Sequence, residues 1–157
     1  MSDSAAAKPA KSAKASSKVG GRRQGREAAL QALYLFDACG WALDDIPETA
    51  WSELKMEPKI RAFAWHLAEG VIDEIDRIDA LIVKTAQNWE MKRMATVDRN
   101  ILRLAAFELL YDLDTPVRVA INEALEIVKA YSTDESYRFV NGILDKIREE
   151  RPAHGKE

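Results

Sequence analysis

The chain has 157 residues, of which 47% are hydrophobic and 31% charged, and this balance is typical of a globular domain rather than a disordered or fibrous chain. Its one cysteine, Cys39, excludes an intramolecular disulfide framework and a thiol cluster for zinc or iron–sulfur ligation. No apolar run approaches the roughly 20 residues that cross a bilayer, and the first 19 residues lack the apolar stretch of a secretory signal. We therefore expect a cytoplasmic protein with no membrane association.

The net charge of −3 is distributed unevenly along the chain. Residues 1–26 contain seven basic residues and one acidic residue, a net charge of +6, whereas the remaining 131 residues carry −9. A basic head on an acidic body indicates one surface for polyanions and another for a basic partner. A solubilising tail on an acidic domain would produce the same charges.

Composition divides the chain into three parts. Residues 1–19 are mostly Ala, Lys and Ser, too poor in large apolar side chains to offset the entropy of ordering them, so we predict a disordered basic tail. Residues 20–150 are expected to form one helical domain, and residues 151–157 a polar C-terminal tail.

The first helices follow from apolar residues spaced three and four apart. One helix is predicted from Arg22 to about Cys39, with Cys39 on its buried stripe and Gly40 as its stop. Pro47 favours the first turn of a short second helix. The pattern from residue 58 to residue 82 predicts one long helix, or two helices end to end with Gly70 as the break.

The second half of the chain continues the same period. Residues 96–111 are apolar on nearly every side, which is typical of a helix in the centre of a bundle. The next helix starts near Pro116, and Ser132 with Glu135 predicts a capping box for the last one. We interpret Gly142, inside that last helix, as a close helix–helix contact. The sequence thus predicts an all-α protein.

Residue patterns of enzymes are missing. The chain has two histidines and no glycine-rich phosphate loop, metalloprotease motif or nucleophile elbow. Asp73, Asp76 and Asp79 line one helix face, and a solvated acidic face explains them better than a metal site. We predict no catalytic residue, no metal site and no cofactor.

A basic cluster opens the first helix at Arg22, Arg23 and Arg26. The planar guanidinium matches phosphate oxygens and also stacks on bases. Arginines at the N-terminal end of a helix oppose the helix dipole, which favours acids there, and a bound anion would explain that arrangement. A plain solubilising run is the alternative.

A second candidate contact lies at Arg138 and Phe139. The apolar period directs these two side chains away from the buried stripe of the last helix. An exposed ring beside an arginine offers a platform for an unpaired base, worth about 1–3 kcal/mol per base. Packing of Phe139 against a neighbouring helix is the alternative.

Several motifs in a fixed order resemble the bacterial antitermination factor NusB family. They are residues 26–34 (REAALQALY), 98–109 (DRNILRLAAFEL), 119–129 (VAINEALEIVK) and 139–146 (FVNGILDK). The resemblance extends from about Arg22 to Lys146. It implies an all-helical fold, a compact bundle of about six or seven helices in two three-helix halves.

The resemblance also implies a function. Members of this family bind the single-stranded boxA element of ribosomal RNA leaders together with a small-subunit ribosomal protein, NusE. The pair helps to load factors onto RNA polymerase in an antitermination complex, so that ribosomal operons escape premature termination. Some members of the family form homodimers through the RNA-binding face, so a homodimer is one oligomeric state that the resemblance allows.

Site residues are implied by the same motifs. Arg22, Arg23 and Arg26 match the arginine-rich RNA-contacting opening of the family, and Arg138 with Phe139 matches its basic–aromatic pair. A second set matches positions expected on the partner-protein side: Tyr34, Asp98 and Glu108. Gln24 replaces a basic residue common in the opening, which implies weaker RNA affinity at that position.

Two other functions are consistent with the sequence. A similar helical module precedes the catalytic domain of ribosomal RNA cytosine-5 methyltransferases, but no nucleotide-binding sheet domain follows here, so we expect a free-standing factor. A helical protein–protein adaptor would use the basic head only as a tail. Salt-dependent RNA binding would distinguish the RNA-binding factor from the adaptor.

Overall fold

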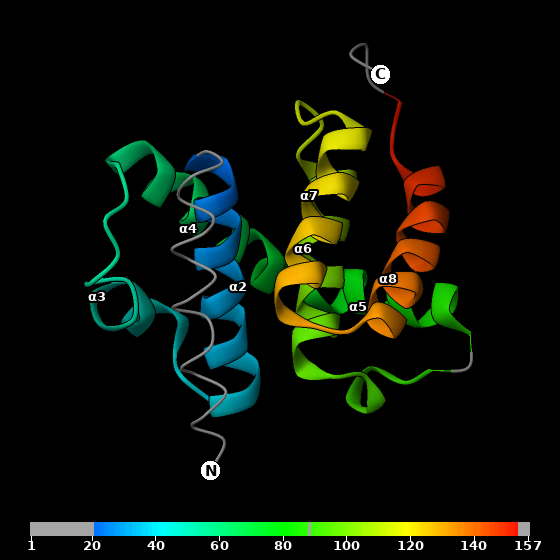
Figure 1. Ribbon diagram of the computed structural model, residues 1–157, viewed down its shortest axis with the longest axis horizontal. Coiled ribbons are helices and arrows are strands. Elements are labelled where there is room, and N and C mark those ends of the chain that lie inside the picture. Colours follow the sequence, from blue (N-terminus) through cyan, green and yellow to red (C-terminus); the bar gives the residue numbers. More distant parts are fainter. Residues whose placement is uncertain (1–20, 88, 154–157) are drawn as a thin grey trace. The chain divides into compact units, whose positions relative to one another are not determined.

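The computed structural model describes residues 21–87 and 89–153, and these residues are helical with no β-strand (Figure 1). The predicted all-α fold is therefore confirmed, whereas the predicted tail of residues 1–19 lies outside the described residues. Among the described residues, no helix has the length and apolar character needed to span a membrane. The seven α-helices of this part of the chain are α2 (Gly21–Cys39), α3 (Ile46–Thr49), α4 (Pro58–Asp73), α5 (Ile75–Ala86), α6 (Thr96–Tyr111), α7 (Val117–Tyr131) and α8 (Asp134–Ile147).

The helices belong to two compact units, and the chain passes from the first unit to the second between Glu69 and Gly70. The first unit contains α2, α3 and most of α4, and the second contains the end of α4 together with α5, α6, α7 and α8. Three short 3-10 helices complete the described chain: η1 (Leu43–Asp45), η2 (Met91–Arg93) and η3 (Arg148–Glu150). The expected two-part organisation is present, with four complete α-helices in the second part.

The core of the first unit is organised around Trp51, which follows α3 and is fully buried. Its indole Nε1 donates a hydrogen bond to the Ala28 carbonyl of α2 at 3.0 Å, and its ring meets that of Trp65 on α4 edge-on at 6.4 Å. The Arg61 guanidinium lies 5.6 Å from the Trp51 ring centroid and donates to the Pro47 carbonyl at 3.1 Å. Through these contacts one ring joins all three helices. The indole can be fully buried because its single polar atom has a hydrogen-bond partner.

The second unit is built around α6. Its residues 101–109 are all buried, and the helix contacts α5, α7 and α8. Arg103 lies within this buried stretch, where Nε and an Nη donate to the two carboxylate oxygens of Asp79 on α5, each at 2.8 Å. A two-pronged ion pair of this kind neutralises a buried guanidinium, so the centre of the unit tolerates one charge among apolar residues.

The break between α4 and α5 occurs at Glu74 rather than at Gly70, so the predicted break position is wrong. Gly70 continues α4. A Cβ added there would lie 2.3 Å from Cζ of Phe107 on α6, far inside any real contact distance. The glycine is therefore required by the close approach of an aromatic ring and not by a helix end.

Three further local predictions are corrected. The last helix begins one residue later than the predicted capping box, because the Thr133 hydroxyl accepts from the Ser136 amide at 3.0 Å. Gly142 is exposed, and a Cβ there would meet nothing within 4 Å, so it makes no close helix contact. Cys39, expected in the core, is exposed at the end of α2.

Candidate nucleic-acid interface

The arginine-rich start of α2 is organised by one aromatic ring from α4. Arg22 and Arg26, four residues apart, lie on the same face of the helix. Their guanidinium carbons lie 4.0 Å and 5.3 Å from the centroid of the Phe63 ring. Both distances are within the range of cation–π attraction, so the ring holds the two arginines.

Gly25 provides the space for this ring. A Cβ at residue 25 would lie 2.8 Å from Cδ2 of Phe63 and 3.4 Å from the Ile60 carbonyl oxygen. Because the added atom would overlap the Phe63 ring, a larger residue would displace that ring from its place against α2. The glycine between the arginines therefore has a packing role that the sequence pattern did not reveal.

The three arginines differ in exposure. Arg22 is exposed, Arg23 is half-buried, and only 5% of Arg26 is accessible. Arg26 therefore lies on the buried side of the helix. Arg22 is the member of the cluster that presents its guanidinium to solvent.

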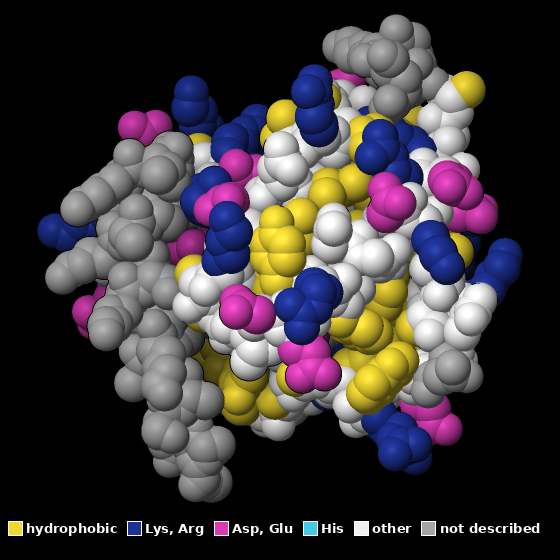
Figure 2. Space-filling view, turned by 45° about the vertical axis from the view of Figure 1, so that its right-hand side comes forward, with side chains coloured by type: hydrophobic (Ala, Val, Ile, Leu, Met, Phe, Trp, Pro, Cys, Tyr) yellow, Lys and Arg dark blue, Asp and Glu magenta, His cyan; other side chains and the backbone are white. Residues whose placement is uncertain are grey.

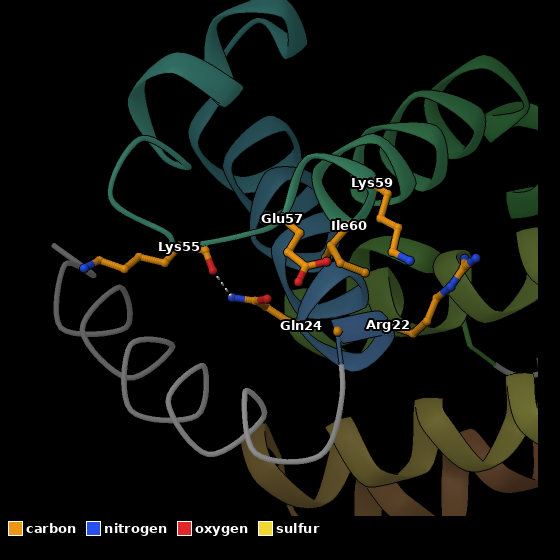
Figure 3. A pocket seen from close by; sticks show the side chains of 7 residues that line it. Arg22, Gln24, Lys55, Glu57, Lys59 and Ile60 are labelled. Atoms are coloured by element: carbon orange, nitrogen blue, oxygen red, sulfur yellow. Dashed lines mark hydrogen bonds between the residues drawn. The ribbon is translucent and has the colours of Figure 1, made fainter.

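An open depression of about 540 Å³ adjoins Arg22. Figure 3 shows its lining residues, which come from the starts of α2 and α4 and from the segment before α4. The Gln24 side-chain amide donates to the Lys55 carbonyl at 3.3 Å and links α2 to that segment. Gln24, which the sequence marked only as a missing basic residue, thus has a structural contact.

The second candidate contact lies on α8, in the other unit. Arg138 is exposed and Phe139 is half-buried. The Phe139 ring meets the ring of Trp89 at 5.6 Å between centroids and an interplanar angle of 64°. Trp89 is 46% exposed, and an indole with this much accessible surface presents apolar area to solvent.

Trp89 was missed by the sequence analysis because it lies outside every helical pattern. The signal available was a large aromatic residue in a short polar connection. The segment after Trp89 is fixed on α6, since Arg99 donates to the carbonyls of Met91 and Met94 at 3.2 and 3.3 Å. Trp89 is therefore followed by an anchored turn.

The three residues expected on the partner-protein side differ in how exposed they are. Tyr34 on α2 is half-buried, whereas Asp98 and Glu108 on α6 are only 6% and 2% accessible. Asp98 accepts hydrogen bonds from the hydroxyls of Ser132 at 2.8 Å and Ser136 at 2.5 Å. Because both carboxylates are buried, neither presents its charge on an open surface to a partner protein.

The residues predicted to contact RNA thus form two groups, each within its own unit. Arg22 and Arg26 share a ring in the first unit, and Arg138 and Phe139 are neighbours in the second. On the face drawn in Figure 2, basic and acidic side chains are interspersed among apolar patches. No group of three or more His, Cys, Asp or Glu in the described ranges is arranged to hold a metal ion.

An exposed arginine beside aromatic rings, on the helical scaffold of the described residues, is typical of one class of protein: a helical protein suited to bind single-stranded nucleic acid. Comparison with known families agrees with the class. The NusB family profile matches residues 23–149. The chain belongs to the NusB family.

Relatives cover most of the chain. The transcription antitermination protein NusB of Myxococcus xanthus (strain DK1622) is 45% identical over 133 residues, which span 82% of this chain and 95% of the relative. The transcription antitermination protein NusB of Geobacter sp. (strain M21) is 47% identical over 137 residues, 80% of this chain and 92% of the relative.

Solved structures show the same fold. NusB of T. maritima superposes with a TM-score of 0.76 at 38% identity, covering 84% of this chain and 93% of the other. A crystal structure of the antitermination factors NusB and NusE in complex with double-stranded RNA gives a TM-score of 0.73 at 27% identity, covering 83% of this chain and 97% of the other.

Proposed function

We propose that the protein is an RNA-binding transcription antitermination factor that binds the boxA element of ribosomal RNA leader transcripts together with the ribosomal protein NusE. The names of the relatives and the solved complex of a similar protein with NusE and RNA support this function. The observation that carries the proposal is the exposed Arg22 guanidinium lying 4.0 Å over the Phe63 ring. The same relatives favour the factor over a methyltransferase module.

Arg22 is suited to the RNA backbone. Stacking on Phe63 limits the freedom of a long side chain, so less conformational entropy is lost when its N–H groups engage a phosphate. Arg23 adds positive charge beside Arg22. The buried Arg26 contacts the Phe63 ring by a cation–π interaction. In this proposal the first unit contributes mainly electrostatic attraction.

The second unit is suited to bases. Phe139 and Arg138 offer an aromatic ring and a guanidinium, both of which stack on unpaired bases. Trp89 extends the aromatic surface beside Phe139. Stacking tolerates any base, so we assign binding strength rather than sequence choice to this group.

NusE and the RNA polymerase antitermination complex are the proposed protein partners. Tyr34 is the most accessible of the three residues assigned to the partner side. Asp98 and Glu108 are buried, so we assign them a positioning role. Asp98 acts through Ser132 and Ser136, which lie where α7 gives way to α8.

We further propose that residues 20–150 form a non-catalytic RNA-binding domain that works in the bacterial cytoplasm, where transcription occurs. The names of the relatives, which describe transcription factors rather than enzymes, support this assignment. A homodimer that covers the RNA-binding face would be an inactive form, and added RNA would dissociate it.

The proposal is tested by fluorescence anisotropy with a labelled, short single-stranded boxA-type RNA, titrated with the full chain over a series of salt concentrations. We expect binding that weakens with salt, and tighter binding when NusE is present. A scrambled RNA serves as the control. Binding of NusE without any binding of RNA would identify a protein–protein adaptor instead.

A further inference from the structure

The depression beside Arg22 lies where two helices begin. Gly21 and Arg22 belong to the first turn of α2, and Lys59 and Ile60 to the first turn of α4. Free N–H groups give the start of a helix a partial positive charge, which an acidic residue normally balances. Neither helix has an acidic residue in its first turn, but Glu57 directly precedes α4 and its carbonyl accepts from the Ile60 and Arg61 amides.

The side chains around the depression leave its positive charge unbalanced. Arg22, Lys55 and Lys59 line it together with a single acid, Glu57. Glu57 makes no ion pair within 4.0 Å with either lysine or with any other residue in the described ranges. Like charges held at one site without a counter-ion repel one another, and an arriving anion relieves that repulsion.

Two of the three cations converge. Figure 3 shows the side chains of Arg22, from α2, and Lys59, from α4, extending toward the same region, whereas the Lys55 ammonium points away. The Gln24 amide bonded to the Lys55 carbonyl bounds another side of the depression. The arrangement therefore offers two positive groups from two different helices to one ligand.

We propose that Arg22 and Lys59 together hold a phosphate of the RNA backbone, so that the RNA path continues from the start of α2 onto the start of α4. This inference rests on the proposed function and adds Lys59 to it. An open depression of about 540 Å³ suits a passing polynucleotide better than a small enclosed anion. Glu57 at the same site opposes the phosphate and weakens its binding.

The test compares Lys59→Ala, Lys59→Arg and Glu57→Gln in the full chain by anisotropy over a salt series. One lost phosphate contact to a single strand lowers the slope of log K against log salt by about 0.7, and we expect this change for Lys59→Ala. Lys59→Arg should retain the slope, and Glu57→Gln should strengthen binding. Because a phosphate contact carries no base information, boxA-type and scrambled RNA should respond alike.

Lys146→Ala, which removes the same charge from the exposed last turn of α8, is the matched control. An equal slope change in this variant would attribute the effect to net charge and overturn the inference. If Lys59→Ala has the same salt slope as the wild-type protein, the inference is overturned. As long as the wild-type protein binds RNA, that result leaves the proposed function intact. Absence of RNA binding by the wild type would instead reject the proposed function.

A second titration uses a 5′-mononucleotide in place of RNA. Weak binding that does not depend on Lys59 agrees with a backbone subsite. Saturable mononucleotide binding that is lost in Lys59→Ala, with an unchanged RNA slope, would identify a small-anion site and overturn the inference.

Discussion

The two candidate RNA contacts use the same residue types in opposite arrangements. In the first unit the aromatic ring, Phe63, is 8% exposed and the arginine above it, Arg22, is accessible. In the second unit Trp89 is 46% exposed, and its ring lies against Phe139. The first arrangement presents charge supported by a ring, and the second presents rings flanked by the charge of Arg138.

The difference separates two kinds of binding energy. Charge on phosphate releases counterions and weakens steeply with salt, whereas a stacked base releases none. The two units are therefore expected to contribute to RNA affinity in ways that a salt series distinguishes. Variants in each unit can break or sharpen this comparison.

Phe63→Ala should have the largest effect, because it removes a buried ring that also carries two arginines. We expect a loss of about 3–5 kcal/mol in the free energy of unfolding, measured by thermal or urea denaturation. Phe63→Leu keeps much of the apolar volume but removes the aromatic face. If Phe63→Leu binds RNA with wild-type affinity, the ring does not orient Arg22.

Asp98→Asn should disturb the second unit and leave the arginine cluster of the first unchanged. Ser132 and Ser136 donate to different carboxylate oxygens, and asparagine replaces one of these oxygens by an amide nitrogen that cannot accept. We therefore expect a loss of about 1.5–3 kcal/mol in unfolding free energy. Denaturation measures this loss. Asp145→Asn, an exposed acid on α8, is the control, and an equal loss there would argue against the network.

Phe139→Ala should weaken RNA binding by about 1–3 kcal/mol and leave the salt slope unchanged, because a ring releases no counterions. Trp89→Ala should weaken it in the same salt-independent way. Anisotropy over a salt series measures both. As a control, Trp41→Ala removes another exposed indole, from the first unit, and should bind RNA with wild-type affinity. A lower melting temperature of Phe139→Ala with unchanged RNA affinity would assign Phe139 to packing instead.

Arg22→Ala should lower the salt slope by about 0.7 with little change in melting temperature, since the side chain is exposed. Arg26→Ala should show the reverse, a lower melting temperature, because that arginine is 5% exposed and lies over Phe63. Salt titrations and thermal melts on the two variants measure the contrast. Equal slope changes would place both arginines on phosphate.

The smallest expected effect is a pH dependence of the second unit. Burial, and then the hydrogen bond that its hydroxyl donates to Glu74 at 3.2 Å, raise the pKa of Tyr111 above its ordinary value of 10.0. A raised folded-state pKa contributes stability that is present below pH 10 and is lost as the pH rises through that pKa. In urea denaturation above pH 10, Tyr111→Phe should lose less stability than the wild-type protein. If the two proteins have the same pH profile, the pH dependence does not come from Tyr111.

Sequence reasoning recovered the helices and the class of function, and it proposed two groups of RNA-contacting residues from their residue types. Its errors share a cause. Gly70 was predicted to break a helix and Gly142 to make a close helix contact, yet the first is required by Phe107 and a Cβ at the second would meet nothing within 4 Å. Whether a glycine serves packing depends on what lies opposite it, and that partner is distant in the chain.

The sequence by itself determined the local structure, because helical periodicity, the Gly40 stop and the helix-starting Pro58 act within a few residues. Only the tertiary structure decided which side chains meet. Phe63 lies under Arg22, Trp89 meets Phe139, and Ser132 donates to Asp98, although each pair is separated by more than thirty residues. Such pairs arise from helix packing, which no short-range rule specifies, and they determine whether a charge is presented to solvent or buried.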